Sequence, residues 1–227
     1  MEWWFFTTQH IITIILTLAA PFIFYLILKK FKPQTQDKLL FYFSFLGLFG
    51  IVGNLWVWIK EDILIWKLPF HLCSWTAMLL PIAAKTKSSK LCGTVAVWSI
   101  GALIAIILND EAIHYKMFGI KWFIYFLPHL AEFCIPLLLL FLNKYKMKWS
   151  NVLWIWTATA VVYTISFMIS YLLSWYFKTD VNYLFTMHST NFVTDFLYSL
   201  LPYRYWYMYT AFPLIALLTL GVYFKRR

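Results

Sequence analysis

Two ionisable side chains, His129 and Glu132, lie inside one of the long hydrophobic stretches of this chain. Their i, i+3 spacing places both on one face of a helix, and Pro128 and Pro136 on either side can each kink it. Glu132 follows Lys121 by eleven residues, which gives a depth of about 16 Å if the stretch crosses a membrane. Ionisable groups are costly there and commonly serve a function. We expect a coupled acid–base pair; a hydrogen bond that only joins helices is the alternative.

A thiol and a second histidine open another hydrophobic stretch, in the sequence Leu68-Pro69-Phe70-His71-Leu72-Cys73. The reactive form of cysteine is the thiolate, which needs a base to accept its proton. His71 is poorly placed for this, because positions i and i+2 of a helix point about 200° apart. His129, from another helix, is therefore the first candidate for the base. Cys73 as a small packing residue is the alternative, and it is the simplest interpretation of Cys92 and Cys134.

Further polar residues fall at a similar depth. Asn54 lies six residues before Lys60 and could donate a hydrogen bond to an oxyanion. The histidines all lie toward the same end of their stretches, and these are His10, His71, His114, His129 and His188. This asymmetry predicts a polar cavity that opens outward. The three cysteines form neither a disulfide framework nor a zinc pattern, so we expect no metal and no other cofactor.

The overall composition identifies lipid as the solvent for these groups. Hydrophobic residues make up 63% of the chain and charged residues 12%, against about 45–50% and about 25% in soluble domains. A net charge of +10 would suggest nucleic acid for a soluble protein. In a membrane protein the basic residues instead determine orientation. We therefore expect membrane lipids and no nucleic acid as partners, while no feature indicates a particular protein partner.

Seven hydrophobic stretches approach the roughly 20 residues that a spanning helix needs. They are about 8–28, 39–59, 67–84, 91–108, 121–142, 151–177 and 205–224. No long linker or low-complexity tract divides them, so the sequence predicts an all-α fold in which residues 1–227 form a single transmembrane bundle. Gly47, Gly50 and Gly53 predict close helix packing on the second stretch.

Charge alternates along the connections between these stretches. Thirteen of the nineteen basic residues, with Asp37 as the one acid, fall in alternate connections and the C-terminal tail. The positive-inside rule places those connections in the cytoplasm. We therefore predict a multi-pass protein of the cell membrane with its N-terminus outside and its C-terminus inside. The first residues lack a basic n-region, so no cleavable signal peptide is expected.

The longest outer connection, residues 178–204, contains helical apolar spacing from Phe192 to Leu201, with Thr190 or Asn191 as N-cap. A short helix on the outer interface is one interpretation. A linker helix that only covers the bundle is an equal alternative. Asn182, His188 and Asp195 in this connection would contribute to the cavity if they turned inward over it.

These residues together resemble the YwaF-like integral membrane proteins of bacteria, whose animal relatives are multi-pass proteins linked to phospholipid acyl transfer. The resemblance covers nearly the whole chain. It rests on Gln9-His10, on residues 68–73, on His129, on Asn182-Tyr183, and on Pro202-Tyr203-Arg204-Tyr205-Trp206. It implies that Cys73 matches the cysteine proposed to carry the acyl group in the animal branch.

The leading hypothesis is ping-pong acyl transfer on phospholipids in an outward-facing cavity. Cys73 is the nucleophile, His129 its first and His71 its second candidate base, and Glu132 orients His129. The expected substrate-binding residues are Asn54, His10, Asn182, Tyr183 and His188. An outward site favours a phospholipid over cytosolic acyl-CoA as donor.

Two other classes of protein remain as alternatives. A transporter or flippase would bind a proton or a cationic head group at His129 and Glu132 without covalent chemistry. A receptor or sensor is compatible with seven spans. Substitution of Cys73 distinguishes these classes from an acyltransferase, since only acyl transfer requires the thiol.

Overall fold

The computed structural model describes residues 7–60, 65, 68–108, 115–146, 148–190 and 192–224, and its regular elements are helical. The long helices begin with α1 (Thr8–Leu28), α2 (Pro33–Lys60), α3 (Leu72–Thr86), α4 (Ser89–Leu108) and α6 (Ile120–Phe141). They continue with α7 (Trp149–Phe177), and the shorter α8 (Phe192–Leu200) and α9 (Phe212–Phe224) follow. Two 3-10 helices, η2 (Tyr183–Phe185) and η3 (Trp206–Ala211), precede α8 and α9 respectively. The predicted all-α class is confirmed.

Five of these helices are long and apolar enough to cross a membrane: α1, residues Pro33–Val57 of α2, α4, α6 and α7. The chain is therefore an integral, multi-pass membrane protein. Their ends agree closely with the expected stretches, except that α2 begins at Pro33 rather than near residue 39. The short helix expected from the apolar spacing near residues 192–201 is also present, as α8.

The third and seventh expected spans differ from prediction. Helix α3 starts at Leu72 rather than near residue 67, because Pro69 has no backbone N–H and disfavours helical geometry at the residue before it. Its 15 residues cover about 22 Å, less than the roughly 30 Å hydrocarbon core. The seventh stretch begins as the 3-10 helix η3 and becomes α-helical only at Phe212, after Tyr205 adopts a positive φ of 64°.

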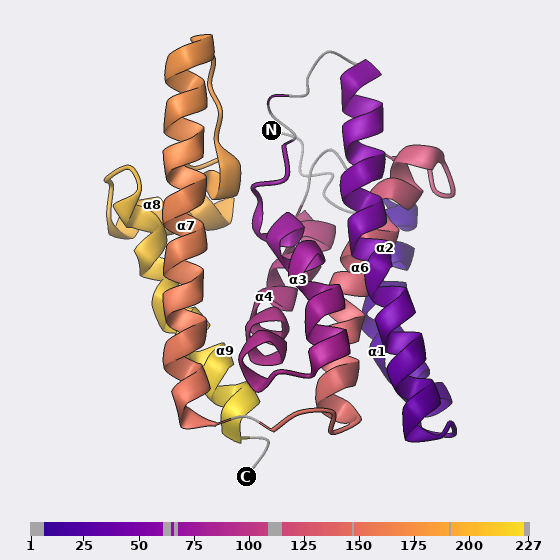
Figure 1. Ribbon diagram of the computed structural model, residues 1–227. Helices are drawn as coiled ribbons and strands as arrows, with labels where there is room; N and C mark the ends of the chain where they lie inside the picture. Colours follow the sequence, from indigo (N-terminus) through magenta and orange to yellow (C-terminus); the bar gives the residue numbers. More distant parts are fainter. Residues whose placement is uncertain are drawn as a thin grey trace.

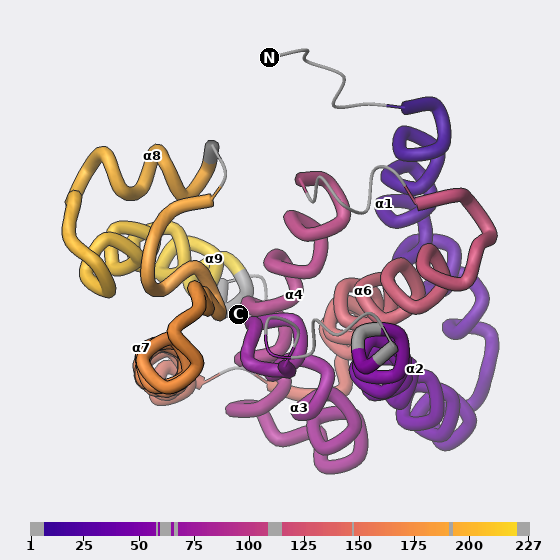
Figure 2. The backbone as a smooth tube through the Cα atoms, turned by 90° about the horizontal axis from the view of Figure 1, so that it is seen from above, coloured from indigo at the N-terminus to yellow at the C-terminus, as the bar shows by residue number. Residues whose placement is uncertain are grey.

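The helices form two groups (Figures 1 and 2). In one group α2 packs against α3 and α6, α4 packs against the same two helices, and α1 packs against α6. In the other group α7 packs against α9, with α8 beside η3. Helix α4 joins the groups, since it contacts both α7 and α9.

Glycines bring α2 against its neighbours, as expected. A Cβ atom built on Gly50 would lie 2.2 Å from Cγ of Pro128, and one built on Gly47 would lie 3.0 Å from Cβ of Ala77. No other residue type fits at Gly50 without moving a helix. Helix α2 therefore sits directly on the α6 residue that precedes His129.

Asp37 forms ion pairs with two of the basic connections, at the opposite end of this group of helices. Lys144 Nζ lies 2.8 Å from Oδ1 of Asp37, and Lys87 also pairs with Asp37. The beginning of α2 and the ends of α3 and α6 are thus tied together at the lower end in Figure 1. The basic connections share one end of the bundle, as the alternating charge requires.

Candidate active site

The structure brings together Cys73, His129 and Glu132. One donor atom from each residue lies within 4.8 Å of the others. Helix α6 supplies His129 and Glu132, one turn apart on a single face, and α3 supplies Cys73. Glu132 is 2% exposed and His129 7%, while Cys73 is half-buried. A thiol, an imidazole and a carboxylate therefore share one sheltered site.

A backbone carbonyl fixes the orientation of His129. Its Nδ1 lies 2.7 Å from the carbonyl oxygen of Tyr125, and its ring stacks on the Tyr125 ring with centroids 4.4 Å apart. A carbonyl can only accept, so Nδ1 carries the hydrogen and Nε2 of the neutral ring keeps its lone pair. Tyr125 is itself held, because its hydroxyl donates to the carbonyl of Ala105 at 2.8 Å.

Glu132 has an unsatisfied oxygen. Its buried Oε2 makes no hydrogen bond within the part of the chain that the structure describes. Its backbone carbonyl also lacks the usual helical donor, since Pro136, four residues on, has no N–H. A buried acceptor without a partner costs about 1–3 kcal/mol. Such an oxygen in a cluster of reactive groups indicates a partner that the described residues do not supply.

Cys73 occupies the first turn of α3. His71 is the N-cap residue and makes no side-chain cap hydrogen bond. The first N–H groups of an α-helix have no acceptor within the helix. The N–H groups of Cys73 and Ser74 lie beside the thiol sulfur. The helix dipole adds partial positive charge at this end. These N–H groups are placed to stabilise an oxyanion formed by attack of the sulfur on a carbonyl.

His71 lies apart from the cluster. Its Nδ1 accepts a 3.3 Å hydrogen bond from the backbone N–H of Leu184, and its ring packs edge-on against Tyr183. The helical i, i+2 geometry expected for His71 and Cys73 does not apply, because His71 precedes α3 rather than sharing it with Cys73. His71 connects the start of α3 to the outer connection.

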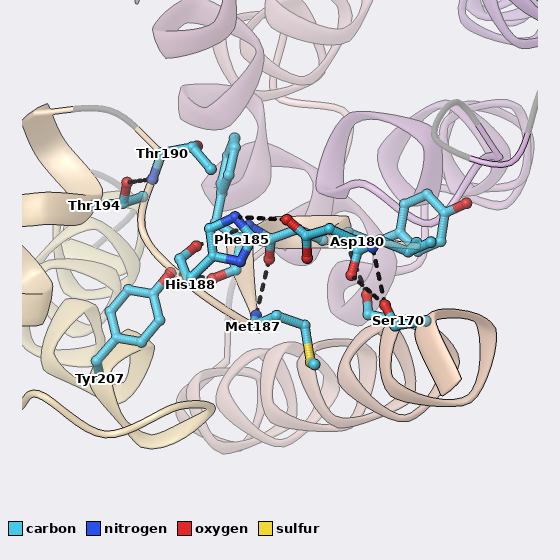
Figure 3. Close-up of polar contacts among 12 residues, drawn as sticks. Ser170, Asp180, Phe185, Met187, His188, Thr190, Thr194 and Tyr207 are labelled. Atoms are coloured by element: carbon cyan, nitrogen blue, oxygen red, sulfur yellow. Dashed lines mark hydrogen bonds and ion pairs between the residues drawn. The ribbon is translucent and has the colours of Figure 1, made fainter. Parts of the chain in front are cut away.

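That outer connection is a folded element anchored to α7 (Figure 3). Ser170 Oγ accepts from the N–H of Tyr183 at 2.9 Å, and Ser174 Oγ accepts from the N–H of Val181 at 2.9 Å. The hydroxyl of Tyr207 donates to the carbonyl of Phe185. The segment that faces the start of α3 is therefore held from both α7 and η3.

The expected ligand residues of this connection serve its own fold. Asn182 donates from Nδ2 to the carbonyl of His188 and accepts at Oδ1 from the N–H of Met187, both at 2.8 Å. His188 Nε2 lies 3.3 Å from Oδ2 of exposed Asp180. Burial raises the pKa of Tyr183 to about 12, so its hydroxyl stays protonated and donates to the carbonyl of Ile65. The structure does not bring these residues to the cluster.

The remaining described candidates, Asn54 and His10, lie on α2 and α1. Asn54 is half-buried and shares the face of α2 that carries Gly47 and Gly50, since it follows Gly50 by one turn. His10 lies in a pocket between α1, α4 and α6, where its Nε2 is 2.7 Å from the carbonyl of Ile106. Tyr125 also lines that pocket, while its ring stacks on His129. His114 lies outside the described residues.

Sequence reasoning did not identify two supporting residues. Tyr125 was detectable, because it lies four positions before His129 and so one helical turn away. Ser166 on α7 donates to the carbonyl of Phe70 at 2.9 Å and holds the segment before Cys73. No local pattern connects Ser166 to residues so distant in the sequence.

Comparison with known proteins places the chain in a family. The model of the TMEM164 family matches residues 5–222. No curated protein and no solved structure matches the chain. With nearly its whole length covered, the chain belongs to the TMEM164 family.

Proposed function

We propose that the chain is a membrane-embedded acyltransferase that carries an acyl group on Cys73 and transfers it to a lysophospholipid. The observation that supports this most directly is the approach of Cys73, His129 and Glu132 to within 4.8 Å of one another. A nucleophile beside a base whose second ring nitrogen is held by a hydrogen bond, here to the Tyr125 carbonyl, is the arrangement used for acyl transfer on unrelated folds.

In the first half-reaction, Nε2 of His129 takes the proton of the Cys73 thiol. The thiolate attacks the ester carbonyl of a phospholipid, and the ester C–O bond breaks. His129 returns the proton to the departing alkoxide, so a lysophospholipid leaves and a thioester remains on Cys73. Glu132 stabilises the imidazolium that forms between these proton transfers.

In the second half-reaction, a lysophospholipid hydroxyl gives its proton to His129 and attacks the thioester. The C–S bond breaks, and the new ester leaves as His129 returns the proton to Cys73. Backbone N–H groups at the start of α3, with Asn54 as a second candidate, stabilise the oxyanion in both steps. Loss of one such donor typically costs about 100- to 1,000-fold in rate.

The test is to incubate the purified full-length chain with a phospholipid labelled in its acyl chain. We expect label on Cys73, released by neutral hydroxylamine as a thioester. Cys73→Ser removes this hydroxylamine-sensitive label. Cys134→Ala is the matched control, because Cys134 is a buried thiol outside the cluster and its loss should not affect labelling. Equal labelling of Cys73→Ala and wild type would exclude the covalent route and leave the transporter or flippase.

We further propose that α3 and the segment from η3 through α9 complete seven crossings of the cell membrane, with the N-terminus outside. The charge alternation supports this orientation. In a chain whose native cysteines are replaced, Asp180→Cys should react with an impermeant maleimide from outside, whereas Ser88→Cys should react only after permeabilisation. Labelling of Ser88→Cys in intact cells would contradict the topology.

A further inference from the structure

We propose that Cys73, His129 and Glu132 form a binding site for Zn²⁺, with three protein ligands and one open coordination position. This goes beyond the covalent chemistry proposed above, and its inhibitory consequence rests on that proposed function. Within the described ranges of the chain, this is the one cluster of three such residues whose donor atoms lie this close together.

The spacing of the donor atoms is close to that of a zinc site. Zn–S bonds of about 2.3 Å and Zn–N and Zn–O bonds of about 2.0–2.2 Å place tetrahedral ligands about 3.3–3.8 Å apart. The observed donors lie within 4.8 Å of one another, so the widest pair must approach by about 1 Å.

The tautomer of His129 suits a metal ligand. Histidines that bind metals usually donate their second ring N–H to a carbonyl or carboxylate, which fixes the ring and leaves the other nitrogen for the metal. The Nδ1 bond to the carbonyl of Tyr125 at 2.7 Å is such a contact. The Tyr125 ring stacked on His129 restricts rotation of the imidazole further.

Glu132 provides an independent indication of a missing ligand. Its Oε2 is buried without a hydrogen-bond partner among the described residues, and the side chain is 2% exposed. A bound cation would satisfy this oxygen. The i, i+3 spacing of His129 and Glu132 directs both ligands to one side of α6.

Charge balance favours a divalent cation bound to this set of ligands. When Zn²⁺ binds, the Cys73 thiol releases its proton to water, so a thiolate and a carboxylate oppose the two positive charges and the complex is neutral. A neutral complex avoids the cost of an isolated charge in a low-dielectric interior. The thiolate selects Zn²⁺ over Mg²⁺ and Ca²⁺, which prefer oxygen ligands.

The consequence for acyl transfer is inhibition. Zn²⁺ engages the sulfur that attacks the ester and the Nε2 atom that moves the proton, so neither can take part in the covalent route. Bound metal and the acyl thioester therefore exclude each other. A chelator should increase labelling of Cys73, and micromolar Zn²⁺ should suppress it reversibly.

The direct test uses Co²⁺ as a spectroscopic probe on the purified full-length chain, reduced with a phosphine that does not chelate metals. We expect a near-ultraviolet sulfur-to-cobalt charge-transfer band that saturates at one equivalent and disappears when Zn²⁺ is added. Cys73→Ser should remove the band, and Glu132→Gln should weaken binding by at least about 10-fold, the lower range for loss even of an outer-shell contact. Cys134→Ala should bind as wild type does.

Two results would overturn the proposal: a band that persists in Cys73→Ser, or one that is lost in Cys134→Ala. Thermal unfolding of each variant without metal separates loss of a ligand from loss of the fold. An unfolded Cys73→Ser variant would be replaced by Glu132→Gln, for which unchanged affinity would also overturn the proposal.

The metal titration needs no lipid substrate, and acyl labelling is measured in the presence of chelator. If Co²⁺ binds and no thioester forms, the proposed function fails while the metal site stands. If a thioester forms and Co²⁺ does not bind, the metal site alone fails.

Discussion

Helices α6 and α7 lie in the two groups of the bundle and are held in different ways. Of the most apolar 18-residue window of each helix, 72% is buried in α6 and 28% in α7. Helix α6 is surrounded by α1, α2, α3 and α4. Helix α7 instead presents a single buried stripe, which comprises Asn151, Val152, Ile155, Thr159, Val162, Tyr163, Ser166 and Ser170.

The contacts of the two helices also differ in chemistry. Small residues let α2 approach α6, as at Gly50 and Pro128, whereas hydroxyl groups connect α7 to its neighbours, as at Ser166 and Ser170. Lipid gives little hydrophobic drive for helix association, so packing and hydrogen bonds must join the helices. The reactive cluster lies where packing is tightest. The segment that faces the start of α3 is held by hydrogen bonds, which can break and re-form singly.

The largest effects should come from the cluster itself. His129→Ala and Glu132→Gln should each lower the rate of acyl transfer, by about 100- to 10,000-fold for loss of the base. The double variant should lose little more than His129→Ala alone, because Glu132 acts through His129. Rates of lipid product formation by the two single variants and the double variant measure this coupling.

Additive losses would show that His129 and Glu132 act independently. Full activity in either single variant would show that the pair serves only as a contact between helices. Cys92→Ala serves as a control for general damage to the packed core, since Cys92 is buried near the start of α4 and is not part of the cluster.

The next effect should come from the packing of α2 on α6. Gly50→Ala places a Cβ atom 2.2 Å from the Pro128 ring, which cannot move without displacing His129. Overpacking of this kind costs about 1–3 kcal/mol, or a fall of about 2–12 °C in the unfolding temperature of a chain this size. Gly221→Ala is the matched control, because no atom lies within 4 Å of a Cβ built there.

Both stability and acyl labelling should fall in Gly50→Ala, while Gly221→Ala should change neither. If Gly50→Ala unfolds at the wild-type temperature, the close approach of α2 and α6 is not what positions His129.

Much of this arrangement was predictable from the sequence, for identifiable reasons. Long apolar stretches fix the spanning helices, and the i, i+3 spacing fixes the shared face of His129 and Glu132. A common depth then predicted that Cys73 would be near them. The predicted start of α3, near residue 67, was wrong, because apolar residues before Leu72 masked the effect of Pro69. The connection from Val181 to His188 was not predictable, since several of its hydrogen bonds join residues far apart in sequence and its path includes two positive φ angles, at Leu184 and Phe185.

The smallest expected effect concerns the hydrogen bonds that connect α7 to its neighbours. Ser166→Ala removes the hydrogen bond to the carbonyl of Phe70 and leaves a carbonyl without its donor. We expect a cost of about 1 kcal/mol, since interhelical hydrogen bonds in membranes average about 0.6 kcal/mol and unsatisfied acceptors cost more. The unfolding temperature should fall by about 2–4 °C. Thr157→Ala is the control on the same helix, because its hydroxyl bonds only within α7, to Leu153. A larger fall than for Gly50→Ala would reverse the comparison, since the hydrogen-bonded contact would then be the stronger of the two.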